Sequence, residues 1–309
     1  MLHVRVIAPA ELTDRVVERL DRDEAITHVV VLPSVALSPP GDLIEFDVVR
    51  EGANGILADL NELGLHQDGA IVLERIDTSI SAAADRAARS APGLGVDAVV
   101  WREIEQQTGE ESRLSVSFLA FMVIAMVIAA VGVLLDQPIL IVGSMVVGPE
   151  FGPLAALCVG LVKRRGALVR RSAAALGVGF PVGMMLTVVA VWLLTAADLV
   201  DRSMLTAERP LTDFIWRPDA LSWVIGFLGG VAGILSLTSA KAGTLVGVLI
   251  SVTTVPAAAN AAVALAYGVR DEAVGSFLQL VINLAAIVLA GVLTLLVQQV
   301  VWRFGAARA

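Results

Sequence analysis

Six long apolar stretches constrain the fold of this chain more than any other feature of its sequence. They fall at about 114–135, 138–162, 172–197, 220–240, 243–268 and 273–301. Each is long enough for a helix to cross a hydrocarbon core of about 30 Å. The chain is 57% hydrophobic with a mean hydropathy of +0.81, whereas soluble domains are roughly 45–50% apolar. The stretches predict an α-helical integral membrane protein of six segments, with the lipid bilayer as its first partner.

The charge of the chain changes at about residue 113. The first 113 residues carry 10 Lys and Arg against 21 Asp and Glu, a net charge of −11, whereas the rest carries 12 against 9, a net charge of +3. An acidic part argues against nucleic acid as a partner, because such binding requires a cationic face. We expect a cytoplasmic domain at 1–78, an amphipathic helical connector at 79–113 and a transmembrane domain at 114–309.

Residues 1–78 alternate between strand and helix patterns in the order β-α-β-β-α-β. The expected strands are His3–Ile7, His28–Pro33, Leu43–Arg50 and Ala70–Ile76, the helices are Glu11–Asp21 and Gly55–Leu63, a turn lies at Pro39–Gly41, and Asn54 is the expected N-cap of the second helix. This order predicts an α+β ferredoxin-like domain with both helices on one face of an antiparallel sheet. By analogy, such a head binds a small metabolite or nucleotide; the alternative is an assembly or packing module.

The three histidines of the chain, His3, His28 and His66, all lie in this head. Their spacings match no metal site, and we interpret them as core or surface residues. No nucleophile stands beside a base at a usable spacing in the sequence. We therefore expect no metal, no cofactor and no catalytic residue, and we do not expect an enzyme.

The connector at 79–113 is expected to form two helices that are broken at Ala91–Gly95. Both have one apolar face, as in Val96, Val100 and Ile104 of the second. Such helices bury one side only, against the membrane or a neighbouring subunit.

The connections between the apolar stretches carry opposite charges on the two sides of the membrane. With the head inside, the inner connections, which are Lys163–Arg171, Lys241 and the C-terminal tail, hold eight basic residues and no acidic one. The outer connections, Asp136, Asp198–Asp219 and Arg270–Glu272, hold four basic and eight acidic residues. The positive-inside rule therefore predicts that both termini are cytoplasmic.

The two halves of the membrane part resemble each other weakly. A shift of 107 residues places Ser144 on Ser251 and Pro149 on Pro256. Because each half holds three segments, the second half would be inverted relative to the first. Inverted repeats recur in secondary transporters, whose sites form near the midplane where corresponding helices break.

The stretch PILIVGSMVVGPEFGPLAALCVGLVKRR, residues 138–165, places a carboxylate and two prolines in an apolar run. Pro149 and Pro153 would interrupt a helix, and the freed carbonyl groups survive at membrane depth only inside the protein or along a cavity. Glu150 would cost several kcal/mol there unless it is paired, hydrated or protonated. We expect Glu150 to face a polar interior as a proton or cation site. The alternatives are a neutral Glu150 bonded to a freed backbone group, or a re-entrant segment that leaves it near water.

Polar and helix-breaking residues of both halves are expected to line one ligand or transport pathway. They are Ser144, Pro149, Glu150, Gly152, Pro153, Ser251, Pro256, Asn260 and Asn283, with Gln279 facing the same interior. A cytoplasmic mouth is expected at Ser236, Thr238, Ser239 and Lys241. Lys241 either meets an anionic ligand there or extends to the surface as a positive-inside lysine. The small residues of GFLGGVAG, residues 226–233, predict close packing against another helix or subunit.

Two stretches give the chain a family resemblance: ILIVGSMVVGPEFGPLAAL after the first apolar segment, and SLTSAKAGTLVGVLISVTTVPAAANAAVAL in the second half. With a small cytoplasmic domain ahead of them, they resemble a bacterial membrane family catalogued as domain of unknown function 389. The resemblance implies the architecture above and a bacterial inner membrane. The chain departs from the family where relatives often carry an apolar residue at Glu150 and a proline at Ala257.

Three functional hypotheses follow from these features. The first is a transporter or channel for a small solute or ion with a cytoplasmic regulatory domain. The second is a sensor or scaffold that binds a small metabolite or nucleotide and transports nothing. A membrane enzyme is the weakest. The small-residue helix face and the head also predict a homo-oligomer.

Overall fold

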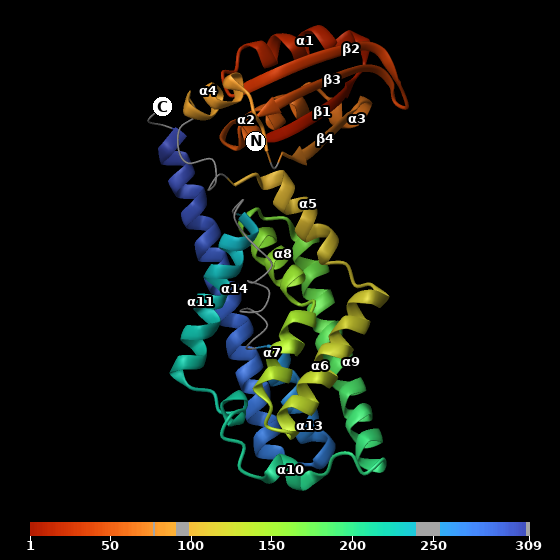
Figure 1. Cartoon of the computed structure of the whole chain (residues 1–309), viewed down its shortest axis with the longest axis vertical. Helices are drawn as coiled ribbons and strands as arrows, with labels where there is room; N and C mark the ends of the chain where they lie inside the picture. Colours follow the sequence, from red (N-terminus) through yellow and green to blue (C-terminus); the bar gives the residue numbers. More distant parts are fainter. Residues whose placement is uncertain (77, 91–98, 239–253, 307–309) are drawn as a thin grey trace. The chain divides into compact units, whose positions relative to one another are not determined.

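The chain divides into two compact units in the computed structural model, which describes residues 1–76, 78–90, 99–238 and 254–306. The first unit is built around Met1–Ile104. The second is built around Glu105–Leu237 and the described residues from 254 to 299 (Figure 1). The domain boundaries expected at 78 and 113 stay predictions.

The first unit is a four-stranded antiparallel sheet with helices. Its elements are β1 (Leu2–Ala8), α1 (Ala10–Asp21), β2 (Ile26–Leu37), β3 (Pro40–Val48), α2 (Arg50–Glu62), α3 (Leu65–Asp68), β4 (Ala70–Arg75) and α4 (Ala82–Ser90), and α5 (Trp101–Glu111) begins in it. The strand order is β2-β3-β1-β4. The order of strands and main helices is the one expected from the sequence, and α3 is an additional short helix.

The core of this unit lies on one face of the sheet. Alternate residues of the strands are buried, such as Val4 in β1 and Phe46 in β3, and they pack with Leu20 of α1 and Ile56 of α2. Full burial of one such side chain stabilises the fold by about 1.5–3 kcal/mol. Both main helices therefore cover the same face, and the opposite face carries polar residues, among them Asp47.

Asn54 does not cap the second helix, so that expectation is wrong. The helix begins four residues earlier, at Arg50, and Asn54 lies inside it. Its amide donates to the carbonyl of Val99 at 2.7 Å, and its Oδ1 accepts from the backbone N–H of Trp101 at 3.1 Å. Asn54 thus provides hydrogen-bond partners for the backbone at the start of α5. Trp101, the first residue of that helix, lies 47 residues away in the sequence.

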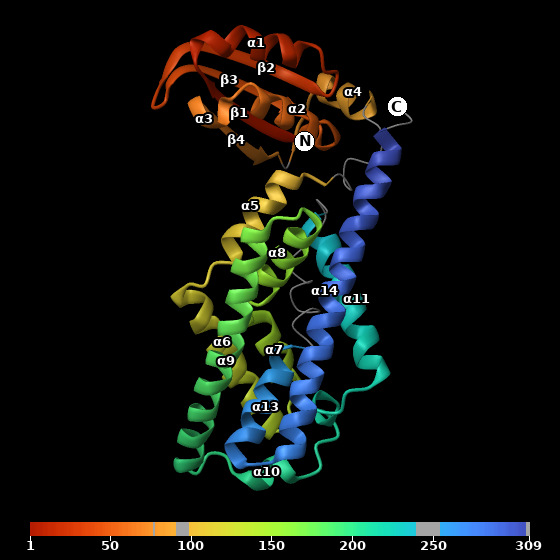
Figure 2. The same cartoon turned by 180° about the vertical axis from the view of Figure 1, so that it is seen from behind.

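The second unit is helical throughout its described part. Its helices are α6 (Val116–Leu134), α7 (Pro138–Val147), α8 (Phe151–Val162), α9 (Gly166–Ala196), α10 (Arg202–Thr206), η2 (Asp213–Ile215), α11 (Ala220–Thr238), α13 (Val255–Tyr267) and α14 (Arg270–Ala306). Figure 2 shows that the long helices of this unit run side by side, with α6 and α9 in one direction and α11 and α14 in the opposite direction.

Four helices are long and apolar enough to cross a membrane, namely α6, α9, α11 and α14. The bent pair α7 and α8 makes a fifth if it counts as one span, and α13 is a shorter apolar helix of 13 residues. The predicted fifth segment, 243–268, lies partly outside the described residues. Less than half of each long helix is buried inside the protein, and the rest presents large apolar side chains. Such surfaces are compatible with insertion in a membrane and indicate a membrane protein.

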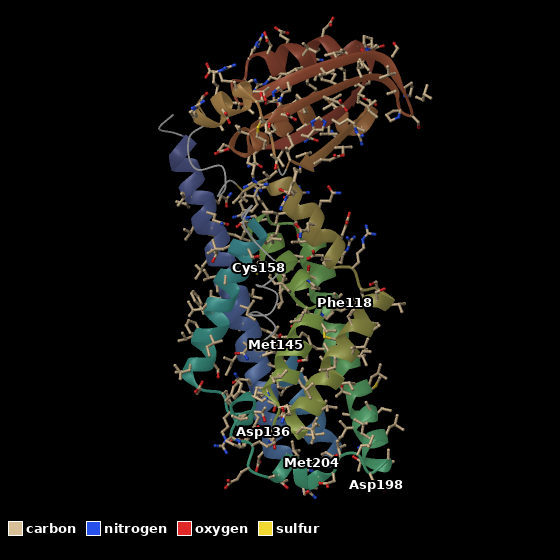
Figure 3. All side chains as sticks on the ribbon, in the orientation of Figure 1. Phe118, Asp136, Met145, Cys158, Asp198 and Met204 are labelled. Atoms are coloured by element: carbon tan, nitrogen blue, oxygen red, sulfur yellow. The ribbon has the colours of Figure 1, made fainter. Side chains whose placement is uncertain are left out.

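Glycines allow the helices to approach closely. A Cβ on Gly183 of α9 would lie 2.7 Å from the sulfur of Met126 in α6, and one on Gly230 of α11 would lie 2.6 Å from the carbonyl oxygen of Ile287 in α14. The predicted close packing of the glycines in 226–233 is thus confirmed for Gly230. Figure 3 labels Phe118 and Met145, which belong to the core that α6, α7, α9 and α13 share.

The connections that were assigned from the sequence to the outer side of the membrane lie at one end of the helical unit. Asp136, between α6 and α7, accepts from the Oγ1 of Thr212 at 2.8 Å. Thr195 near the end of α9 bonds to the hydroxyl of Tyr267 at the end of α13 at 2.8 Å. Figure 3 shows Asp136, Asp198 and Met204 at this same end, which we call the acidic end.

Candidate functional site

The helix break predicted in the second apolar segment lies between α7 and α8. The two helices are bent by 55°. Pro149 stands in the link between Val147 and Phe151, where its missing N–H ends the helix. Pro153 does not interrupt the chain as expected, because it lies in the first turn of α8, where an N–H has no partner within the helix.

Glu150 is completely buried and immediately precedes α8. Its Oε1 accepts a hydrogen bond from the Oγ1 of Thr254 at 2.9 Å. Thr254 is also completely buried, and it immediately precedes α13. The N-termini of two helices therefore meet at this contact, and the positive ends of both helix dipoles favour a negative charge there.

Thr254 was not expected in the site, although the sequence carries a signal for it. A threonine two residues before Pro256 is typical of the start of a helix. Its side chain does not cap its own helix; the hydroxyl donates to Glu150 instead. The helix that follows is buried along Val255–Ala264, where mostly small side chains let neighbouring helices approach.

Two expected pathway residues near the break have mainly local roles. The hydroxyl of Ser144 is buried and donates to the carbonyl of Ile141 in its own helix at 2.6 Å. Gly152 lies against α5, since a Cβ there would be 2.5 Å from the Cβ of Glu111. The hydroxyl of Ser144 is therefore used within its own helix, and Gly152 allows α8 to pack closely against α5.

A second buried polar cluster lies at the acidic end of the unit. Arg209, in the loop before η2, forms an ion pair with Glu272 of α14, and both side chains are less than a tenth exposed. Asn260 of α13 donates to Glu272 at 3.0 Å and to the Oγ of Ser276 at 2.7 Å. We call these four residues the ion-pair cluster. Only Asn260 was expected in the site; Arg209 and Glu272 had been assigned to the outer connections.

The buried polar residues of α14 form one stripe. Glu272, Ser276, Gln279 and Asn283 recur at spacings of three or four, which place them on the same helix face. All four are buried. The Oε1 of Gln279 has no hydrogen-bond partner among the described residues. The stripe extends from the ion-pair cluster to Asn283, whose Oδ1 lies close to Gly226 of α11.

The expected cytoplasmic mouth is described only in part. Ser236 is half-buried in α11, and Thr238 is buried at its end. Ser239, Lys241 and Ser251 lie outside the described residues. Pro256 is buried in the first turn of α13.

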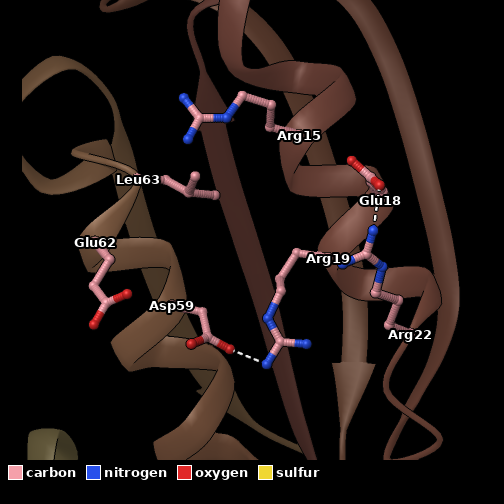
Figure 4. Close-up of a pocket in the computed structure, with 7 residues that line it drawn as sticks. All are labelled: Arg15, Glu18, Arg19, Arg22, Asp59, Glu62 and Leu63. Atoms are coloured by element: carbon pink, nitrogen blue, oxygen red, sulfur yellow. Dashed lines mark hydrogen bonds and ion pairs between the residues drawn. The ribbon is translucent and has the colours of Figure 1, made fainter.

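A polar hollow opens between α1 and α2 of the first unit (Figure 4). It has a volume of about 310 Å³ and is lined by Arg15, Glu18, Arg19, Arg22, Asp59, Glu62 and Leu63. Arg19 pairs with Asp59, and Arg22 pairs with Glu18. Arg15 takes part in no ion pair among the described residues, and its guanidinium group is a candidate partner for an anionic ligand.

Comparison with known proteins supports the family resemblance. Residues 145–289 match the family model described as "Domain of unknown function (DUF389)". This part of the chain, somewhat less than half of its length, is similar to the DUF389 family. The matched range contains Glu150, Thr254 and the ion-pair cluster. No curated protein and no solved structure matches the chain. Among the residues that the structure describes, no group of three His, Cys, Asp or Glu side chains could hold a metal ion.

Proposed function

We propose that this protein is an integral membrane transporter or channel for a small solute or ion, with a cytoplasmic domain that regulates it by binding a ligand. The observation that carries the proposal is the buried contact between Glu150 and Thr254, where two helices begin in the apolar interior. A carboxylate at that depth is costly, and side chains of this kind recur in ion and proton pathways. Transporter sites are typically built where broken helices of two halves meet.

The polar stripe on α14 supports a pathway that continues from this contact. Its residues offer hydroxyl, amide and carboxylate groups along a helix whose other faces are apolar. The ion-pair cluster would close the acidic end of the pathway, since a buried Arg209 and Glu272 leave no room for a solute between them. In this proposal Glu150 binds a cation or proton, and the ion pair separates when the acidic end opens.

Several finer features belong to the proposal. The offset of 107 residues places α6 on α11, α8 on α13 and α9 on α14, which supports two inverted repeats. The strand order β2-β3-β1-β4 with both helices on one face supports a ferredoxin-like head. We also propose a homo-oligomer in a bacterial inner membrane, with the head and the C-terminus cytoplasmic, and no nucleic acid partner.

Flux measurements on purified protein in liposomes test the proposal. We expect dissipation of an imposed gradient of protons or monovalent cations, and a loss of at least tenfold in Glu150→Gln, which keeps the shape of the side chain but cannot ionise. Glu111→Gln removes a carboxylate on α5 and serves as the control. Liposomes that stay tight to protons, cations and a broad panel of solutes would contradict a transport function.

The polar hollow of the head favours a second candidate function, that of a sensor that transports nothing. Its three arginines, two on α1 and Arg22 directly after it, are suited to the phosphate or carboxylate groups of a small metabolite or nucleotide. A ligand that raises the melting temperature of the protein, with loss of the shift in Arg15→Gln and no flux under any gradient, would favour this function over transport.

A further inference from the structure

Three polar side chains on the open face of the sheet form a continuous chain of hydrogen bonds. The Oδ2 of Asp47 in β3 lies 2.7 Å from the Nδ1 of His28 in β2, and the Nε2 of His28 lies 2.7 Å from the Oγ of Ser81. All three belong to the first unit. We propose that Ser81 is a nucleophile activated by His28, and that the head hydrolyses small esters.

The backbone supports this arrangement at each position. His28 lies at an irregularity of β2, between Thr27 and Val30, and has a φ of 56°. β-Bulges bend a strand and re-aim a side chain, and they are frequent beside active sites. The second oxygen of Asp47 lies 2.8 Å from the Nδ1 of His3, so the carboxylate is held between two imidazoles.

The order of the atoms is the one that general base catalysis requires. When Asp47 accepts the Nδ1 proton of His28, the lone pair of Nε2 faces the Ser81 hydroxyl and can take its proton. Asp47 is a positioning residue, because it fixes the tautomer and orientation of His28.

The start of α4 supplies donors for a developing oxyanion. Ser81 immediately precedes this helix, and its Oγ accepts from the N–H of Ala83 at 3.2 Å. The N–H of Ala82 follows Ser81 directly and takes no part in the hydrogen bonds of the described residues. The N–H of the residue after the nucleophile is a common oxyanion donor in serine hydrolases.

The proposed reaction has two steps, acylation of Ser81 and hydrolysis of the acyl-serine, and His28 acts as the base in both. The Ser81 oxygen bonds to the carbonyl carbon of the ester while its proton passes to His28 Nε2, and the carbon–oxygen bond to the alcohol then breaks. The leaving alkoxide takes the proton from His28 and departs as the alcohol. Water then attacks the acyl-serine through the same base, which releases the carboxylic acid and restores Ser81.

The surroundings of Ser81 fit a small apolar acyl group. The His28 side chain is 37% exposed, so a substrate has access to it. The neighbouring Ile80 is 96% exposed and offers an apolar contact beside the nucleophile. Among the described residues, no lysine or arginine takes part in the side-chain hydrogen bonds of His28, Asp47 and Ser81, which favours an uncharged ester.

The competing explanation is that Ser81 only caps α4, since serine is a favoured N-cap and both Ala83 and Ala84 donate to it. Ser81→Asp separates the two roles, because aspartate retains a cap but cannot be acylated in this way. Ser90→Ala is the matched control: this second serine of α4 donates to the carbonyl of Arg86 in its own helix. His28→Asn removes the base, and asparagine accepts a positive φ readily.

The test uses the full-length protein in detergent, a fluorophosphonate probe and p-nitrophenyl acetate, with mass spectrometry of the labelled peptide. We expect covalent label on Ser81, absent in Ser81→Asp, at least 100-fold slower in His28→Asn and unchanged in Ser90→Ala. Thermal melting verifies that each variant is folded. Absence of label on Ser81, or labelling that His28→Asn does not slow, would overturn the proposal, whether or not the protein transports a solute.

Discussion

At the scale of single residues, the hydroxyl of Thr254 is the contact whose loss is easiest to isolate. Thr254→Val keeps the shape of the side chain and removes the hydrogen bond to Glu150. Loss of a buried hydrogen bond to a charged group costs about 1.5–3 kcal/mol, and we expect a lower melting temperature and slower flux. Thr187→Val is the control, because this buried threonine donates to the carbonyl of Gly183 in its own helix. Equal effects in both variants would remove the special role of Thr254.

The ion pair between Arg209 and Glu272 should be strongly coupled. Removal of one charge leaves the other buried without its counterion, which costs about 3–5 kcal/mol, whereas removal of both charges is often nearly neutral. We therefore expect Arg209→Met and Glu272→Gln each to lower the melting temperature, and the double variant to recover most of the loss. Additive losses in the double variant would show that the two residues act independently.

Asp42 makes the stability of the head depend on pH. The Oγ1 of Thr13 donates to this carboxylate at 2.6 Å and the N–H of Ser34 donates at 2.8 Å, and these bonds lower the pKa of Asp42. The carboxylate thus contributes stability above its unfolded pKa of about 3.9, and this contribution is lost as pH falls through the lowered folded pKa.

Amide hydrogen exchange of α1 and β3 measures this effect. Below about pH 4, we expect the loss of protection on acidification to be smaller in Thr13→Val than in the wild type, because the variant has less of the pKa shift to lose. An identical acid response in the two proteins would contradict the contribution of Thr13.

At the scale of elements, the packing of α11 on α14 depends on a glycine. A Cβ at Gly230 would lie 2.6 Å from the carbonyl oxygen of Ile287, and backbone cannot yield easily. We expect Gly230→Ala to destabilise the protein by about 1–3 kcal/mol. Gly177→Ala in α9, where a Cβ would meet nothing within 4 Å, should be neutral or slightly stabilising, because alanine favours a helix. Melting temperatures of the two variants provide the comparison.

The elements themselves were largely predictable, because they follow from local periodicity. The strands, the two main helices and the break at Pro149 could be placed from apolar spacing and proline alone. Hydrogen-bond partners that are distant in the sequence could not be predicted in this way. Asn54 bonds to Val99 and Trp101, and Glu150 bonds to Thr254, across separations that no local pattern encodes. The pairing of His28 with Ser81, 53 residues apart, was hidden for the same reason.

At the scale of the whole molecule, the charge asymmetry and the acidic end make one prediction about orientation. The connection between α8 and α9 carries Lys163, Arg164 and Arg165, whereas the acidic end includes Asp136 and the loop at 198–219. With the basic side in the cytoplasm, Ala207→Cys should react with a membrane-impermeant maleimide added to intact cells, and Ala167→Cys should react only after lysis. Both positions are exposed, and the natural Cys158 is buried and should stay unlabelled. Labelling of Ala167→Cys in intact cells would invert the predicted topology. It would also place Arg209 and Glu272 on the cytoplasmic side, so that the ion pair would close the inner rather than the outer end of the proposed pathway.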